Sequence, residues 1–126
     1  MGKVVNISVS ARHRKAADEA IDAAFDVIEE VDRTLSSYRT ESEVATLNRT
    51  GLLDDPSTML MENVRESLSY ARLTRGAFDI TVQPILDLYD ERFAEDEVPG
   101  DDEIAGLLPL VDYRKVRVLD DRIETG

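Results

Sequence analysis

Two short segments of this chain carry side chains that could bind a ligand. In the first, Ser36-Ser37-Tyr38-Arg39, two hydroxyls stand beside a flat aromatic ring and a guanidinium. Tyr38 could stack on a flavin or adenine ring, and Arg39 could attract a pyrophosphate. The residues alone favour a plainer interpretation, in which the serines satisfy the last carbonyls of a helix and Tyr38 borders the core.

The second segment is Gly76-Ala77-Phe78-Asp79. A glycine after a helix lets the backbone approach a ligand closely, and free N–H groups there could bind an adenine edge or a phosphate. Asp79 could accept hydrogen bonds from a ribose or an adenine amine. The plainer alternative is a helix end with Gly76 at positive φ, a buried Phe78 and a turn aspartate.

The hydrophobic pattern predicts the elements that carry these segments. Alternation of apolar and polar residues from Val4 to Ser10 predicts a strand, and apolar residues at every third or fourth position from Lys15 to Leu35 predict an amphipathic helix. Thr40-Glu-Ser-Glu43 fits a capping box for a short helix that ends near Asn48. A second long helix should begin after Pro56 and end at Gly76.

The C-terminal third reads as short elements. Phe78 to Val82 is β-prone, Pro84 permits a helical turn to Tyr89, and Glu91 to Pro99 reads as an acidic loop. A short helix capped by Asp101 or Asp102 should run to Leu108, and Lys115 to Glu124 should form two strands around an Asp120-Asp121 turn. The predicted fold class is α+β, with two long amphipathic helices packed on a small antiparallel sheet. A strand at the chain end leaves backbone groups unpaired, so we expect Gly126 to be a truncation point.

Composition narrows the possible partners. The formal net charge is −12, from 27 acidic against 15 basic residues, which disfavours nucleic acid and anionic lipid as partners. The few lysines and many aspartates are compatible with ordinary solubility, but we interpret them as adaptation to high salt. No apolar run approaches the roughly 20 residues of a membrane span.

The residue types that are missing exclude several kinds of site. Without cysteine there is no disulfide, thiolate metal site or lipid-anchor cysteine. His13 is the only histidine, which excludes a His-based metal cluster and a Ser-His-Asp triad; we expect it to be a solvated loop residue. The carboxylates between Asp87 and Glu97 lack the spacing of a Ca²⁺ loop.

Leu35 to Asn48, followed by Thr74 to Pro84 and preceded by Met1-Gly2, resembles the N-terminal half of the ApbE-type FAD:protein FMN transferases. The resemblance implies a two-lobed α+β domain, of which residues 1–126 would be the N-terminal part. It also implies contacts with FAD by six residues, namely Met1, Tyr38, Asn48, Ala77, Phe78 and Asp79. Ser42, in the same neighbourhood as Asn48, could simply cap the short helix.

The resemblance further implies a reaction. Such an enzyme moves FMN from FAD to a Ser or Thr of a partner flavoprotein, releases AMP and requires Mg²⁺. The family's Mg²⁺-binding residues and a lysine in a Gly-rich segment lie beyond Gly126, so we expect no catalytic or metal-binding residue in this chain and no activity from it alone. The alternatives are a module that binds FAD without transfer and a structural lobe that pairs with a second copy as a homodimer. Members of the family are often exported, but the chain leaves its compartment open.

Overall fold

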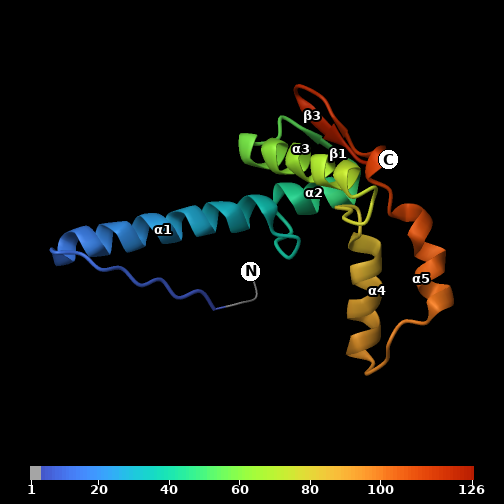
Figure 1. The fold of residues 1–126 in the computed structure, drawn as a ribbon, viewed down its shortest axis with the longest axis horizontal. Coiled ribbons are helices and arrows are strands. Elements are labelled where there is room, and N and C mark those ends of the chain that lie inside the picture. Colours follow the sequence, from blue (N-terminus) through green and yellow to red (C-terminus); the bar gives the residue numbers. More distant parts are fainter. Residues whose placement is uncertain (1–3) are drawn as a thin grey trace.

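A computed structural model describes residues 4–126 as a small body from which two helical parts extend (Figure 1). The elements, in chain order, are α1 (Arg14–Leu35), α2 (Glu43–Thr50), β1 (Leu52–Asp54), α3 (Thr58–Leu73), α4 (Gln83–Ala94), α5 (Asp101–Leu107), β2 (Arg117–Val118) and β3 (Arg122–Glu124), with 3₁₀ turns at Leu108–Leu110 and Tyr113–Lys115. The body consists of α2, α3 and the sheet. Helix α1 extends to one side of it, and α4 and α5 extend from it as a neighbouring pair.

The sheet is antiparallel with the order β1-β3-β2. Ile123 of β3 pairs with Leu53 on one side and Val118 on the other, and its side chain is fully buried. One face of α3 covers this centre because its apolar residues recur at helical spacing. The buried core consists of Leu47, Leu60, Met61, Val64, Leu68, Val116 and Ile123. The predicted α+β class and the predicted turn at Asp120-Asp121 are confirmed.

Helix α1 confirms the prediction for residues 15–35, but little of it is buried. It contacts α2 and α3 near its C-terminal end (Figure 1). Thr34 is its only buried residue, and Phe25 and Val27 are exposed. The apolar stripe of α1 therefore remains largely uncovered by the described residues.

The strand predicted for Val4 to Ser10 is wrong within the described residues. This segment is irregular in residues 4–10 and pairs with no strand of the part that the structure describes. Val4 is 88% exposed and Val9 is 43% exposed. An alternating pattern indicates only that a segment can form a strand, because the ladder itself needs a partner.

The capping box predicted at Thr40 to Glu43 is also wrong in its details. Ser42, not Thr40, caps α2 and accepts a hydrogen bond from the Ala45 N–H at 2.9 Å. The Glu43 carboxylate instead accepts hydrogen bonds from the N–H and hydroxyl of Ser57, the residue that caps α3. The first turn of α2 is thereby tied to the first turn of α3.

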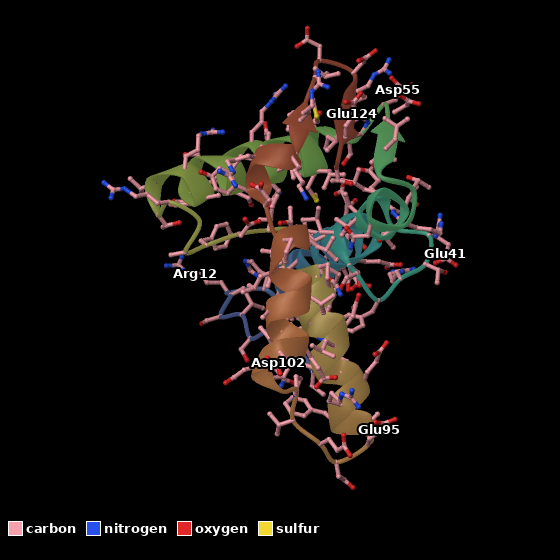
Figure 2. The ribbon with its side chains drawn as sticks, turned by 90° about the vertical axis from the view of Figure 1, so that its right-hand side faces the viewer. Arg12, Glu41, Asp55, Glu95, Asp102 and Glu124 are labelled. Atoms are coloured by element: carbon pink, nitrogen blue, oxygen red, sulfur yellow. The ribbon has the colours of Figure 1, made fainter. Side chains whose placement is uncertain are left out.

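The turn predicted near Tyr89 is a complete helix, α4, which runs on to Ala94. Residues 91–94 are therefore helical, and only the remainder of the predicted acidic loop is irregular. The Arg92 guanidinium, in the last turn of α4, pairs with Glu95, Glu97 and Glu103 and so offsets part of their mutual repulsion. Figure 2 shows Glu95 and Asp102 near the end of the α4–α5 pair that lies far from the body.

Helix α5 begins after Gly100, not after Asp101 or Asp102 as predicted. The Gly100 N–H donates to the Glu103 carboxylate at 2.9 Å, and the two aspartates lie in the first turn. The Gly100 N–H and the Arg92 guanidinium hold the pKa of Glu103 below its usual range, although partial desolvation acts in the opposite direction. Carboxylates in this turn also complement the positive end of the helix dipole.

Candidate functional site

Tyr38 lies in the loop between α1 and α2, residues 36–42, which we call the Tyr38 loop. The residue is 82% exposed, so the plainer interpretation of a tyrosine at the core boundary is wrong. The Arg39 guanidinium beside it donates to the Asp32 carboxylate at 3.1 Å. An exposed ring next to a guanidinium is chemically suited to a flat, anionic ligand.

The backbone of the Tyr38 loop is tied at several points. The Ser42 hydroxyl donates to the Ser36 carbonyl at 2.5 Å, and the Ser42 N–H donates to the Arg39 carbonyl at 3.0 Å. The Ser36 hydroxyl oxygen accepts the Tyr38 N–H at 3.3 Å. These bonds close the loop on itself, so the exposed tyrosine is carried by an ordered backbone.

The second candidate segment begins at the end of α3. The Gly76 N–H donates to the Ala71 carbonyl at 2.8 Å and the Arg75 N–H to the Arg72 carbonyl at 3.2 Å, which is the bonding pattern of a Schellman motif. Gly76 has φ +86°, so its predicted positive φ is confirmed. The left-handed conformation begins one residue earlier, however, at Arg75 with φ +56°.

Ala77 and Phe78 follow on the surface. Phe78 is 44% exposed and packs edge-to-face on Tyr70, with ring centroids 6.5 Å apart. Its N–H donates to the Thr74 hydroxyl at 3.0 Å. The alternative of a buried Phe78 is therefore wrong, and part of the ring is accessible to a ligand.

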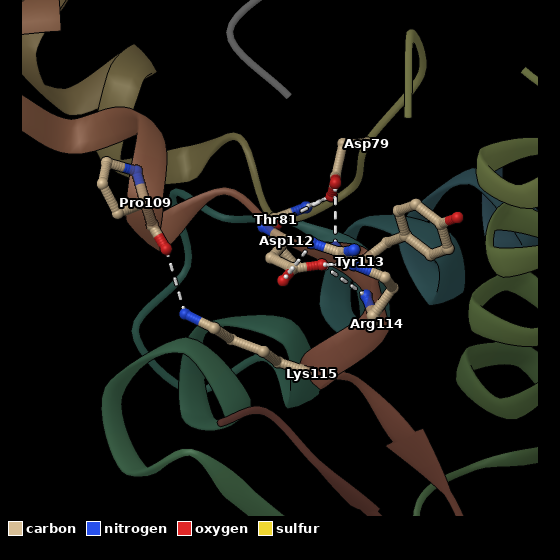
Figure 3. Close-up of polar contacts among 7 residues, drawn as sticks. All are labelled: Asp79, Thr81, Pro109, Asp112, Tyr113, Arg114 and Lys115. Carbon is tan, nitrogen blue, oxygen red and sulfur yellow. Dashed lines mark hydrogen bonds and ion pairs between the residues drawn. The ribbon is translucent and has the colours of Figure 1, made fainter. Parts of the chain in front are cut away.

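Asp79 joins this turn to the segment before β2 (Figure 3). One carboxylate oxygen accepts the Thr81 N–H at 2.9 Å and the Thr81 hydroxyl at 2.7 Å, and the other accepts the Tyr113 N–H at 2.8 Å. The Thr81 hydroxyl oxygen in turn accepts the Asp112 N–H at 2.8 Å. We call these four residues the Asp79 bracket. The hydrogen bonds of the Asp79 bracket explain why residues 78–82 form a turn, whereas their sequence predicted a β-prone, extended segment.

A bidentate ion pair lies beside the bracket. Arg114 donates through Nε to one Asp112 carboxylate oxygen at 2.7 Å and through Nη2 to the other at 2.9 Å (Figure 3). This pairing holds the pKa of Asp112 below its usual range, although partial desolvation acts in the opposite direction. Asp112 is therefore an anion at neutral pH, and its charge is already matched by Arg114.

The predicted residues are not gathered into one cavity. Asn48 lines an open cavity of about 420 Å³, a size within the range of small-molecule sites. Gly76 and Asp79 line a second cavity of about 330 Å³ together with Tyr113. Tyr38, Ala77 and Phe78 are not among the lining residues of either cavity, and Met1 lies outside the described residues.

The larger cavity has an apolar floor and a polar rim. Core residues of α3 form the floor, together with Val116 from the segment before β2. Its rim includes Asn48, Asn63, Ser67, Gln83 and Asp87. Amide and hydroxyl groups around an apolar floor can hold a flat, hydrogen-bonding ring such as that of a nucleotide.

Sequence reasoning missed the partners of Asp79 and the tie between Ser42 and Ser36. Thr81 could have been found, because an aspartate two residues before a threonine is the spacing of a local side-chain turn. Asp112 and Tyr113 could not, since they lie more than 30 residues away in the sequence.

Among residues 4–126, no group of three or more His, Cys, Asp or Glu side chains could hold a metal ion. None of the helices in this part of the chain combines the length and the apolar character that a membrane span requires.

Comparison with known proteins gives a consistent result. The profile of the ApbE family matches residues 1–125. A curated protein of Vibrio cholerae serotype O1 (strain ATCC 39541 / Classical Ogawa 395 / O395), named FAD:protein FMN transferase, is 31% identical over 110 residues, which are 82% of this chain and 33% of that protein.

Two solved structures share the fold. The apo form of the Pseudomonas stutzeri flavinyl transferase ApbE has a TM-score of 0.71 and 25% identity, over 86% of this chain and 36% of that one. The ApbE protein of Thermotoga maritima MSB8 has a TM-score of 0.78 and 22% identity, over 93% of this chain and 39% of that one, and supports the fold alone. The chain thus spans about a third of the length of these relatives. With a family profile that matches it from residue 1 to residue 125 and a fold shared with two ApbE structures, the chain belongs to the ApbE family.

Proposed function

We propose that this chain is the N-terminal, FAD-binding part of an FAD:protein FMN transferase whose remaining residues follow Gly126. The family match over residues 1–125 carries this proposal, and the 31% identity to a protein of that name supports it. In the reaction, an acceptor Ser or Thr oxygen attacks the FMN phosphorus of FAD. The bond from that phosphorus to the AMP oxygen breaks, AMP leaves, and the hydroxyl proton passes to a base.

The residues proposed to contact FAD are Met1, Tyr38, Asn48, Ala77, Phe78 and Asp79. Support comes from the exposed ring of Tyr38 on its closed loop and from the partly exposed ring of Phe78 beside the left-handed turn. Both carboxylate oxygens of Asp79 are engaged by the bracket. A contact between Asp79 and a nucleotide would therefore use the remaining acceptor capacity of these oxygens.

A divalent cation, Mg²⁺ in this proposal, would neutralise charge on the pyrophosphate of FAD. The described residues supply no set of three acidic, His or Cys side chains for it. From the resemblance to the family, we assign its ligands to the sequence after Gly126, together with the catalytic residues, and expect residues 1–126 alone to be inactive.

The activity is tested by incubating the full-length protein with FAD, Mg²⁺ and a flavoprotein acceptor and recording the mass of the acceptor. We expect a covalent FMN increment, and we expect none with residues 1–126 in place of the full-length protein. FAD binding without any increment would favour the alternative of a binding module that does not transfer. A covalent increment produced by the 126-residue chain would contradict the assignment of catalysis to later residues.

The contact with FAD is tested by Tyr38→Ala in the full-length protein. Loss of a stacking platform is worth about 1–3 kcal/mol per ring, or roughly ten- to a hundredfold in Kd. Because Tyr38 is 82% exposed, the melting temperature should not change. Unchanged affinity for FAD would remove Tyr38 from the proposed site.

A homodimer remains an alternative arrangement. Strands β1 and β2 are the two edges of the sheet in the described part of the chain, and an open edge can pair with another strand. Sedimentation of the full-length protein at several concentrations distinguishes the states: a concentration-dependent shift would support self-association, and a constant monomer value would exclude it.

A further inference from the structure

We propose that Ser42 is a positioning residue for flavin binding, which holds the Tyr38 loop in the conformation that presents the Tyr38 ring. The inference rests on the proposed contact between Tyr38 and FAD. Ser42 would thus act beyond the capping of α2, because its hydroxyl bonds to both the helix and the loop.

The Ser42 side chain is buried, with only 1% of the residue exposed. Its hydroxyl oxygen accepts the Ala45 N–H at 2.9 Å, and the hydroxyl donates to the Ser36 carbonyl at 2.5 Å. A single hydroxyl thus fixes the last residue of the Tyr38 loop to the first residue and to the first turn of α2. Burial shields both bonds from competition with water.

Ser36 passes this constraint on to Tyr38. The Ser36 N–H donates to the Asp32 carbonyl at 3.1 Å, which anchors it to the end of α1, and its hydroxyl oxygen accepts the Tyr38 N–H. In the part of the chain that the structure describes, the Tyr38 ring makes no hydrogen bond and no ring contact. The position of the ring therefore depends on the loop backbone, and Ser42 contributes the side-chain bond that joins the two ends of the loop.

The chain supplies a matched control in Ser57. It caps α3 as Ser42 caps α2, since its hydroxyl oxygen accepts the Leu60 N–H at 3.2 Å. Its hydroxyl, however, donates to the Glu43 carboxylate at 2.8 Å and not to a carbonyl of the Tyr38 loop. Ser57→Ala therefore removes a helix cap of the same chemistry and leaves the bond between Ser42 and Ser36 in place.

The test is a double-mutant cycle in the full-length protein, with the Kd for FAD measured by titration calorimetry and the melting temperature measured alongside. We expect Ser42→Ala to raise Kd about three- to tenfold, because the loop then holds the binding conformation for a smaller fraction of the time. In a Tyr38→Ala background, the same change should leave Kd unaltered. Ser57→Ala should lower the melting temperature without a change in Kd, and Ser42→Thr, which keeps the hydroxyl, should recover most of the affinity.

Two outcomes would overturn the proposal while the proposed function stands. One is an equal rise in Kd for Ser42→Ala with and without Tyr38, and the other is an equal rise for Ser57→Ala. If the wild-type protein binds no FAD, the proposed function itself fails. If the wild type binds FAD and Tyr38→Ala binds it equally well, the proposed Tyr38 contact fails. Should Ser42→Ala not fold, Ser42→Gly takes its place, because glycine at an N-cap retains most of the helix stability while the bond to Ser36 is lost.

Discussion

The Asp79 bracket provides the sharpest test of how this fold holds its candidate site. Asp79→Ala removes an acceptor for three hydrogen bonds, from the Thr81 N–H, the Thr81 hydroxyl and the Tyr113 N–H. The turn at residues 78–82 would then lose its attachment to the segment before β2. The Schellman bonds at the C-terminal end of α3 should remain, because they join backbone groups and do not involve Asp79.

The magnitude follows from the number and setting of these bonds. A buried hydrogen bond to a charged group contributes about 1.5–3 kcal/mol, and water competes for those of a half-buried carboxylate. We therefore expect Asp79→Ala to lower the free energy of unfolding by about 2–3 kcal/mol in total. For a domain of this size, that loss corresponds to a fall in melting temperature of roughly 6–15 °C.

Asp79→Asn separates charge from geometry. Its amide oxygen can still accept both bonds from Thr81, but its NH₂ group would then face the Tyr113 N–H, and two donors would meet. We expect a loss of about 1–2 kcal/mol, roughly half that of the alanine variant. The matched control is Asp87→Asn, since Asp87 is exposed and accepts a hydrogen bond from Gln83 within the same helix; its effect should stay within about 0.5 kcal/mol.

The measurements are thermal and urea unfolding of the three variants beside the wild type. If Asp79→Asn unfolds at the same temperature as Asp87→Asn, the bracket contributes no stability and our reasoning is refuted. If stability falls but the affinity for FAD is unchanged at a temperature where the variant is folded, Asp79 is structural and leaves the list of proposed FAD contacts.

Three further predictions concern conformation, pH and salt. Gly76→Val should lower the free energy of unfolding by roughly 1–3 kcal/mol, because a β-branched residue is strained at φ +86°. Steric space does not limit the change, since an added Cβ would lie 3.6 Å from the Tyr113 ring. A melting curve identical to that of the wild type would contradict this prediction. Because the pKa values of Glu103 and Asp112 are lowered in the folded state, their ionised forms stabilise the fold at any pH above their ordinary pKa values, and this stabilisation is lost as the pH falls through the lowered ones. Glu103→Gln should therefore flatten that part of an acid titration of stability, and an unaltered titration would argue against this contribution. With a net charge of −12, stability should rise with added salt through screening, and full stability near zero added salt would count against salt adaptation.

The sequence by itself determined the long amphipathic helix α1 and the left-handed turn that ends α3. Helix α1 was predicted to within one residue because apolar residues recur at helical spacing over more than five turns, a signal that needs no tertiary contact. Gly76 was placed correctly at positive φ for a similar reason, since glycine tolerates that conformation without steric strain. The order of residue types also allowed the resemblance to the ApbE family to be seen, and the family match over residues 1–125 confirms that resemblance.

Only the tertiary structure decided which groups meet. The pattern of residues 4–10 permits a strand, yet no partner strand exists among the described residues. Glu43 has the spacing for a local capping box but bonds to Ser57, 14 residues away, and Asp79 bonds to Tyr113, 34 residues away. Local propensity cannot choose between such partners, because a carboxylate can accept any nearby N–H and the packing of α2, α3 and the sheet determines which one is near. The structure likewise decided that Tyr38 is exposed, since its exposure depends on how the ends of α1 and α2 are joined through Ser42 and Ser36.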